Sequence, residues 1–243
     1  MDEILNPLLD IIYPPTCPIC QEIIIPKGLK ACEPCKDKLT IIKEPRCKKC
    51  SKPIDQEEEE YCSDCEHKNF HFKYGYALWL YEKDIQKSII GFKYHYKKKY
   101  VDFYTEEIIK HLSSKIKKIG PDILAPVPIH WTKHRERGYN QAEILAKSIG
   151  EAMNIKVIPD LLVRNKKTLP QKQLSDKERL HNLQKAFEIN EKVYPKMSGK
   201  LDNVLLIDDI YTTGSTIEAC TNILIKSGIS NVYFLALCIG KGF

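Results

Sequence analysis

Two patterns in the sequence could do chemistry, one by holding metal ions and the other by holding a phosphate. Eight of the ten cysteines form four Cys-x-x-Cys pairs within the first 65 residues, with eleven residues in each gap. Toward the other end of the chain, the apolar run 204–207 leads into Asp208 and Asp209 and then into Thr-Thr-Gly-Ser-Thr. Both patterns need folded elements that hold them in place.

The cysteine pairs predict two zinc sites. A two-residue spacer lets both sulfurs of a pair face one ion, and two pairs complete the tetrahedral thiolate shell that zinc accepts. Pairing in sequence order would give two ribbons in tandem, while a cross-braced arrangement is also open. Disulfides are disfavoured because no secretion signal is present, and iron–sulfur ligation is the other alternative. We expect structural zinc, because many prolines and few core residues leave folding to the metal. The expected ligands are Cys17, Cys20, Cys32, Cys35, Cys47, Cys50, Cys62 and Cys65.

The stretch 204–216 predicts an anion site at the start of a helix. A buried strand is expected to end where Asp208 and Asp209 emerge, and Gly214 permits a tight turn. Hydroxyls and backbone N–H groups at a helix N-terminus attract phosphate, and carboxylates beside them suit the hydroxyls of a sugar. The simpler alternative is a strand end followed by a Thr/Ser cap on the helix.

The elements expected around this site alternate between strands and helices. Hydrophobic periodicity predicts strands over 76–81, 123–127, 157–163, 203–207 and 231–238, and helices over 84–92, 100–112, 141–153 and 215–227. Alternation favours an α/β fold, a Rossmann-like parallel sheet with helices on both faces and ligands at the carboxyl ends of its strands. We expect a double zinc ribbon with a short N-terminal helix over 1–71, and an α/β domain over 72–243.

The net charge of +6 is unevenly distributed. Residues 1–71 hold 10 Lys/Arg against 14 Asp/Glu, which leaves 28 against 18 for residues 72–243, so the two parts carry −4 and +10. The basic part favours phosphate-bearing partners, although a solvated lysine-rich surface is the alternative. Segment 92–100 interleaves cations with aromatic rings, as single-strand binders do, but a basic helix over buried tyrosines has the same pattern. The candidate nucleic-acid contacts are Lys93, Tyr94, Tyr96, Lys97, Lys98 and Lys99.

The apolar content gives no sign of a membrane span. No apolar run approaches the roughly 20 residues that cross a bilayer, and the start Met1-Asp2-Glu3 lacks the basic lead of a secretory signal. We expect a cytoplasmic protein that reaches the inner face of the membrane only through partners.

The stretch 204–216 resembles the phosphoribosyl pyrophosphate (PRPP) motif of type I phosphoribosyltransferases. Together with an N-terminal double zinc ribbon, it makes the chain similar to the ComF family of competence proteins and their GntX relatives. Further matching segments are 124–128 with 135–141, 162–164 with Gln171 and Leu174, and 179–182 with 186–187. The resemblance implies a type I phosphoribosyltransferase-like sheet.

The resemblance also implies a role for each matching segment. Asp208 and Asp209 would bind the ribose hydroxyls, and the 5′-phosphate would lie on Thr212, Thr213, Gly214, Ser215 and Thr216. The pyrophosphate and its Mg²⁺ would face Val127, Pro128, Arg135 and Arg137. A flexible loop carrying Arg164, Lys166, Lys167, Gln171 and Arg179 would close over the site. Such chemistry needs Mg²⁺, cations and oriented carboxylates rather than a protein nucleophile.

The family resemblance implies a function in DNA uptake during natural transformation. The implied partners are PRPP, single-stranded DNA, a competence DNA translocase and other competence proteins. One interpretation is a PRPP-dependent transferase whose acceptor the sequence does not identify. The other is a non-catalytic adaptor that binds DNA or proteins and uses PRPP only as a regulatory ligand. Phosphoribosyltransferases usually cover the acceptor with a hood, which residues 1 to about 115 would have to supply.

Overall fold

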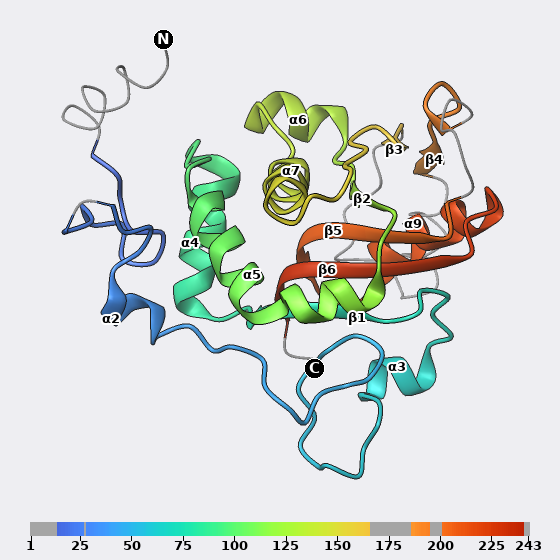
Figure 1. Ribbon diagram of the computed structural model, residues 1–243, viewed down its shortest axis with the longest axis horizontal. Helices are drawn as coiled ribbons and strands as arrows, with labels where there is room; N and C mark the ends of the chain where they lie inside the picture. Colours follow the sequence, from blue (N-terminus) through green and yellow to red (C-terminus); the bar gives the residue numbers. More distant parts are fainter. Residues whose placement is uncertain (1–13, 27, 166–185, 195–200, 241–243) are drawn as a thin grey trace.

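A central sheet of parallel strands organises the chain. The computed structural model describes residues 14–26, 28–165, 186–194 and 201–240. Four strands lie in the order β1-β6-β5-β2 (Figure 1). They are β1 (Gly75–Leu80), β2 (Ile123–Pro126), β5 (Asn203–Tyr211) and β6 (Asn231–Ile239). A short antiparallel pair, β3 (Leu162–Arg164) and β4 (Phe187–Ile189), forms a second sheet.

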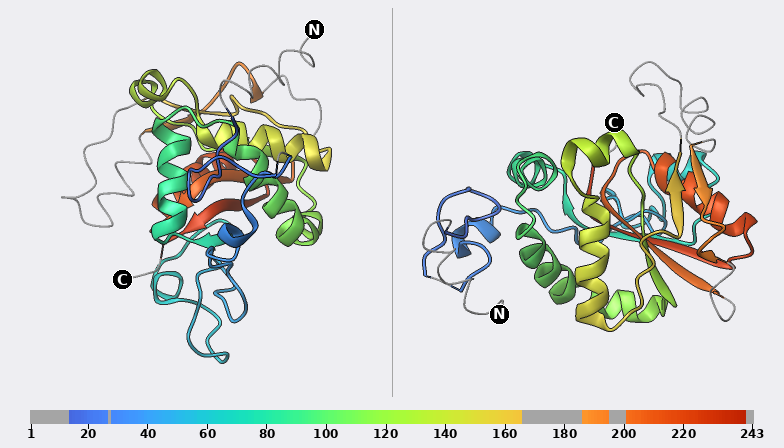
Figure 2. Two further views of the ribbon diagram at one scale, coloured as in Figure 1. Left: turned by 90° about the vertical axis from the view of Figure 1, so that its left-hand side faces the viewer. Right: turned by 90° about the horizontal axis from the view of Figure 1, so that it is seen from above.

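Helices cover both faces of the central sheet (Figure 2). One face carries α4 (Lys83–Tyr94), α5 (Tyr100–Ile119) and α7 (Gln141–Met153), and the other carries α9 (Ser215–Lys226). Side chains along β5 alternate, so Leu205 and Ile207 join the core with α5 and α7, while Val204 and Leu206 join the core with α9. The predicted fold class, a parallel α/β sheet behind a double zinc ribbon, is confirmed.

Several predicted elements differ from the structure. The helix predicted over 100–112 continues to Ile119 in α5. β5 continues to Tyr211 because β6 runs alongside it and pairs with Asp208 and Ile210, so the two aspartates lie within the strand and not after it. The predicted strand over 157–163 is wrong. Val157 forms one parallel bridge to Leu124, and residues 162–164 pair instead with β4. Between Pro128 and Gln141, where no helix or strand was predicted, the chain forms α6 (Trp131–Arg137), whose start is capped by the His130 side chain.

The two zinc ribbons lie against opposite faces of the sheet. The first contributes Cys17 and Ile24 to the core with α4 and α5, and the second contributes Cys47 to the core with α9. The chain crosses between them along the edge strand β1. There the Ile42 N–H donates to the Leu78 carbonyl at 3.0 Å, and the Leu80 N–H donates to the Thr40 carbonyl at 3.0 Å. Residues 40–42 therefore run antiparallel to β1 and cover its edge.

Some predictions lie beyond these observations. The helix expected near the N-terminus falls outside the described residues, and the division of the chain at residue 71 stays a prediction. Within the described ranges, no helix combines the length and the apolar character that a membrane span requires.

Candidate functional site

The eight paired cysteines form two groups of four in sequence order. Within each group the sulfur atoms lie within 4.8 Å of one another, and the groups are Cys17, Cys20, Cys32 and Cys35, and Cys47, Cys50, Cys62 and Cys65. In each ribbon the second pair lies at the start of a short helix, α2 (Glu33–Lys36) or α3 (Ser63–His67). The Cys32 N–H donates to the Cys17 sulfur and the Cys50 N–H to the Cys47 sulfur, both at 3.5 Å. Sulfur sets of this kind fit structural zinc, and the tandem pairing replaces the cross-braced alternative.

Asp208 and Asp209 flank an open edge of β5 near the carboxyl end of the sheet. β2 ends at Pro126, opposite Ile207, and the Val127 N–H then donates to the Ile207 carbonyl at 2.9 Å. Beyond this point no strand of the described chain pairs with β5 on that side. Since successive strand residues face opposite sides, the two aspartates border this edge from both faces of the sheet.

The two carboxyl groups have different surroundings. Asp209 Oδ2 lies 2.8 Å from Lys93 Nζ, and their side chains are only 12% and 17% exposed. Asp208 faces the side of Arg164 and the buried Cys220 thiol. Burial and the adjacent Asp209 raise the pKa of Asp208 to about 7. The pair therefore combines an ion-paired carboxylate with a carboxyl group that titrates near neutral pH.

The loop after β5 has the geometry of an anion cradle. Gly214 has φ +81°, and a Cβ atom there would lie 2.5 Å from the Tyr211 hydroxyl and 2.9 Å from the Phe70 ring, so glycine is required. The hydroxyls of Thr213 and Ser215 lie 3.0 Å apart, and α9 begins at Ser215. Hydroxyls and the first N–H groups of α9 thus lie together, where the helix dipole attracts anions.

Cationic side chains from three elements converge near the carboxylates. Burial lowers the pKa of Lys93, but Asp209 and Asp208 outweigh it, so the net pKa is raised. Burial lowers the pKa of Lys133 on α6, and the charges of Arg137, Arg164 and Lys93 lower it further. Burial also lowers the pKa of Arg164 on β3, and Asp208 partly offsets this effect. Because the charges of these side chains shift one another's pKa values, the cations lie within electrostatic range of one another. They outnumber the two carboxyl groups.

Arg137 is the most firmly held of these cations. It is 7% exposed; its Nη1 donates to Gln141 Oε1 at 2.9 Å and its Nη2 donates to the Tyr94 hydroxyl at 2.8 Å. The guanidinium carbon lies 4.7 Å from the centroid of the Tyr94 ring. Arg137 Nε is buried, with no hydrogen-bond partner within the described part of the chain. A fixed guanidinium with an unused donor is suited to bind an anion.

The structure brings together most of the residues predicted for PRPP. Residues 208–216 form the end of β5 and its loop, and Val127 is hydrogen-bonded to Ile207 beside the open edge. Arg137 and Arg164 lie within electrostatic range of Lys93 and Asp208, whereas Arg135 is exposed on α6. Lys166, Lys167, Gln171 and Arg179 lie outside the described residues. Lys93 was predicted to contact nucleic acid, yet it is paired with Asp209. Neither Lys93 nor Lys133 was predicted as a member of this site; only Lys133, between Pro128 and Arg135, had a local signal.

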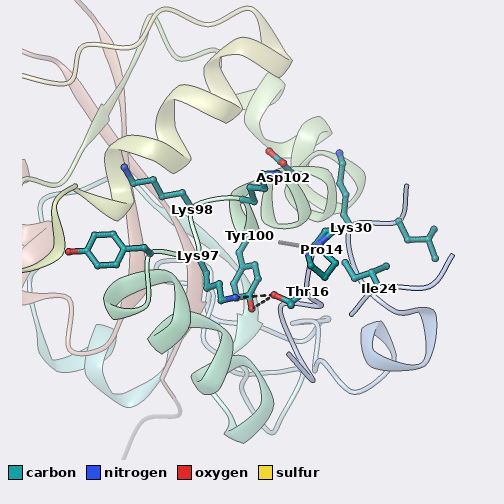
Figure 3. Close-up of a pocket in the computed structure, with 12 residues that line it drawn as sticks. Pro14, Thr16, Ile24, Lys30, Lys97, Lys98, Tyr100 and Asp102 are labelled. Atoms are coloured by element: carbon teal, nitrogen blue, oxygen red, sulfur yellow. Dashed lines mark hydrogen bonds between the residues drawn. The ribbon is translucent and has the colours of Figure 1, made fainter. Parts of the chain in front are cut away.

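The remaining nucleic-acid candidates lie at the end of α4 and on the turn that joins it to α5. Residues 94–99 are all exposed, and Tyr96 is 66% exposed with φ +54°. Lys97 reaches toward Thr16, while Lys98 points away from it (Figure 3) and lies 4.7 Å from the Tyr139 ring centroid. A cavity of about 450 Å³ separates this turn from the first ribbon. The turn thus exposes cations and aromatic rings together.

Comparisons with known proteins match both parts of the chain. Residues 8–66 match the family described as a double zinc ribbon domain. The chain is 33% identical to competence protein F of Haemophilus influenzae over 112 residues, 46% of this chain and 48% of that protein. It is 25% identical to competence protein ComFC of Bacillus subtilis over 210 residues, 82% of this chain and 79% of that protein. The chain is thus similar to competence proteins F and ComFC. The predicted family resemblance is thereby confirmed.

Other similarities are shorter or more distant. DNA utilization protein YhgH of Escherichia coli is 28% identical over 118 residues, 49% of each chain. The chain thus spans about half the length of the Haemophilus and Escherichia relatives that it matches. A purine phosphoribosyltransferase from Pyrococcus horikoshii is 14% identical, with a TM-score of 0.35 over 58% of this chain and 85% of that chain. A hypoxanthine phosphoribosyltransferase from Staphylococcus aureus is 15% identical, with a TM-score of 0.33 over 56% and 63%.

Proposed function

We propose that this chain binds PRPP at the carboxyl end of β5 and acts in the uptake and handling of single-stranded DNA. One observation carries the PRPP assignment: two carboxylates, an anion cradle and an excess of cations meet at one edge of the sheet. PRPP has a ribose diol, a 5′-phosphate and a pyrophosphate, and each group matches one of these three parts.

Under this proposal each part of the site has a role. Asp208 and Asp209 accept hydrogen bonds from the ribose hydroxyls, and residues 212–216 hold the 5′-phosphate. The turn after β2 and Arg137 face the pyrophosphate, with Arg135 at the rim, and Arg164 on β3 borders the same space. Mg²⁺ arrives with the substrate, because pyrophosphate oxygens are the ligands it prefers.

The same arrangement supports transfer of phosphoribose. The bond from ribose C1 to the pyrophosphate oxygen breaks as an acceptor atom attacks C1, and the electron pair leaves with the pyrophosphate. Fixed cations stabilise the negative charge that develops on the leaving group, and the carboxylates orient the sugar. No protein nucleophile is needed. An adaptor that only senses PRPP would bind it without this step, so release of pyrophosphate distinguishes the two functions.

Titration of zinc-loaded protein with Mg-PRPP by calorimetry tests the binding site. The double variant Asp208→Asn/Asp209→Asn should lose at least about 10-fold in affinity, because amides are weaker acceptors than carboxylates. The variant Asp55→Asn/Asp160→Asn makes the same charge change at two exposed positions and should bind normally. If folded wild-type protein binds no PRPP, the proposed function is wrong.

The exposed turn between α4 and α5 favours binding of single-stranded DNA. Cations follow the phosphate backbone and aromatic rings stack on bases. Replacing Lys97, Lys98 and Lys99 by Gln should weaken binding and reduce the slope of log affinity against log salt by about 2. A control with Lys110, Lys117 and Lys118 replaced by Gln removes the same charge from exposed positions on α5. An unchanged slope in the first variant would exclude this turn from DNA binding.

The protein partners that we propose are a competence DNA translocase and other competence proteins. With these partners the chain would act on the cytoplasmic side of the membrane.

A further inference from the structure

Lys93 blocks a carboxylate that PRPP is proposed to use. Its ammonium lies 2.8 Å from Asp209 Oδ2, and both side chains are largely buried. A ribose hydroxyl that takes this oxygen as its acceptor competes directly with the ammonium. Sugar binding at Asp209 therefore requires Lys93 to find another anion, since an unpaired buried ammonium is costly.

The backbone around Lys93 is fixed, so that only its side chain is free to exchange partners. The Tyr139 hydroxyl donates to the Phe92 carbonyl, and Gln141 Nε2 donates to the Lys93 carbonyl at 3.5 Å. One residue further on, the Tyr94 hydroxyl accepts from Arg137. These contacts tie the last turn of α4 to the end of α6 and the start of α7. The four-carbon stem of Lys93 swings its charge without movement of the helix.

The neighbourhood of Lys93 indicates where the ammonium goes. Lys133 and Arg137 lie close enough that the charges of Arg137 and Lys93 depress the pKa of Lys133, after burial. Arg137 Nε faces no acceptor among the described residues. Cations gathered in this way need a multiply charged anion, and the pyrophosphate of PRPP is such a group on the same ligand as the diol.

We propose that Lys93 makes the site specific for PRPP over ribose 5-phosphate, by pairing with Asp209 in the free protein and moving to the pyrophosphate when the ribose diol takes its place. This inference rests on the proposed PRPP function. A ligand with both groups breaks the ion pair and replaces it. Ribose 5-phosphate breaks it and offers no anion in exchange, so it binds weakly.

Calorimetry of Lys93→Met with Mg-PRPP, Mg-pyrophosphate and ribose 5-phosphate tests the proposal. We expect affinity for Mg-PRPP to fall at least about 10-fold, affinity for Mg-pyrophosphate to change little because that ligand has no diol to displace Lys93 from Asp209, and affinity for ribose 5-phosphate to stay the same or rise several-fold. Lys87→Met removes the same charge from an exposed position on the same helix and should change none of the three. Where Lys93→Met does not fold, Lys93→Gln keeps a donor toward Asp209 and should show the same loss of discrimination.

Two results would overturn this inference while leaving the proposed function intact. In the first, wild-type protein binds PRPP and the Lys93 variants bind it equally well. In the second, the variants lose affinity for PRPP and for ribose 5-phosphate by the same factor, as expected for a counter-ion that only holds the fold. Wild-type protein that binds none of the three ligands would refute the proposed function and this inference together.

Discussion

Asp208 and Asp209 are adjacent in sequence, yet they lie on opposite faces of β5 and have different charged neighbours. Asp209 faces Lys93 on the α4 side, and Asp208 faces Arg164 and Cys220 on the α9 side. Burial is the largest influence on the titration of Asp208, whereas Asp209 is in direct contact with an ammonium. Two carboxyl groups with such different surroundings are a common feature of binding and catalytic sites.

Asp208 should therefore reduce the stability of the free protein at neutral pH. Its pKa is about 7 when folded, above the ordinary carboxyl value of 3.8. The stabilisation that protonated Asp208 gives the folded state is therefore complete below about pH 4 and is lost as the pH rises through 7. Asp208→Asn removes this dependence. In urea unfolding, the free energy of unfolding of the variant relative to wild type should grow by about 1 kcal/mol between pH 6 and pH 8. A difference that is constant over this range would contradict the assignment.

Gly214 is predicted to be the least replaceable residue of the phosphate loop. Gly214→Ala combines a positive φ with contacts of 2.5 Å to the Tyr211 hydroxyl and 2.9 Å to Phe70, so it should cost about 1–3 kcal/mol and abolish PRPP binding. Gly228→Ala is a matched control, because its φ is +96° and its nearest neighbour lies at 3.8 Å. Urea unfolding and calorimetry should separate backbone strain alone, in Gly228→Ala, from backbone strain combined with a steric clash, in Gly214→Ala. Equal effects of the two substitutions would show that Tyr211 and Phe70 move to accommodate the new methyl group at position 214.

At the scale of elements, α9 joins the phosphate loop to the segment that follows the second ribbon. Glu218 on α9 is 2% exposed; it accepts from the His71 N–H at 2.8 Å and contacts His71 Nδ1 at 2.5 Å. Asn222 Nδ2 donates to the same carboxylate at 3.0 Å. The Phe70 ring lies against Gly214. The position of the loop therefore depends on contacts between residues 147 positions apart in the chain.

Removal of the His71 side chain should loosen this connection. His71→Ala leaves a buried carboxylate oxygen with fewer partners, which should cost about 1–3 kcal/mol of unfolding free energy and weaken PRPP binding. His95→Ala, at an exposed position, serves as the control in the same urea titration. Retention of wild-type stability by His71→Ala would mean that the His71 N–H and Asn222 are sufficient partners for Glu218.

The predicted elements were correct where hydrophobic periodicity was regular, as in the helix over 141–153, which matches α7. Prediction failed where a local pattern and the tertiary context disagree. Two acidic residues resemble a strand end, yet β6 extends β5 past them. The Lys93–Asp209 pair joins residues 116 positions apart, and no local sequence pattern predicts such a contact. The cysteine spacing predicted the metal sites but not their pairing, which depends on how the ribbons pack.

At the scale of the whole molecule, each zinc ribbon belongs to a different hydrophobic core. The first ribbon packs with α4 and α5, where the Thr16 hydroxyl lies 3.3 Å from the Tyr100 hydroxyl and Lys30 pairs with Glu106 at 3.1 Å. The second ribbon packs with α9, in the same core as Tyr211 beside the phosphate loop. Loss of one metal should therefore affect one face of the sheet more than the other.

The two zinc sites are expected to have separable effects. Cys62→Ser and Cys32→Ser should each reduce bound zinc from two ions to one, but Cys62→Ser should weaken PRPP binding by about 10-fold more, because the phosphate loop shares a core with the second ribbon. Zinc content and PRPP affinity measured on the same samples check this. Equal loss of affinity in both variants would show that the ribbons act as one unit.

The crossing of residues 40–42 over β1 also bears on solubility. β1 has the sequence GYALWL, which lacks charge and proline, and its edge is shielded by the segment that joins the two metal sites. Uncovered strands of this composition pair with copies of themselves and form cross-β fibrils. Removal of zinc with a chelator should thus produce thioflavin-binding aggregates and not only unfolded monomer. We therefore expect the metal to protect against self-assembly as well as to support the fold.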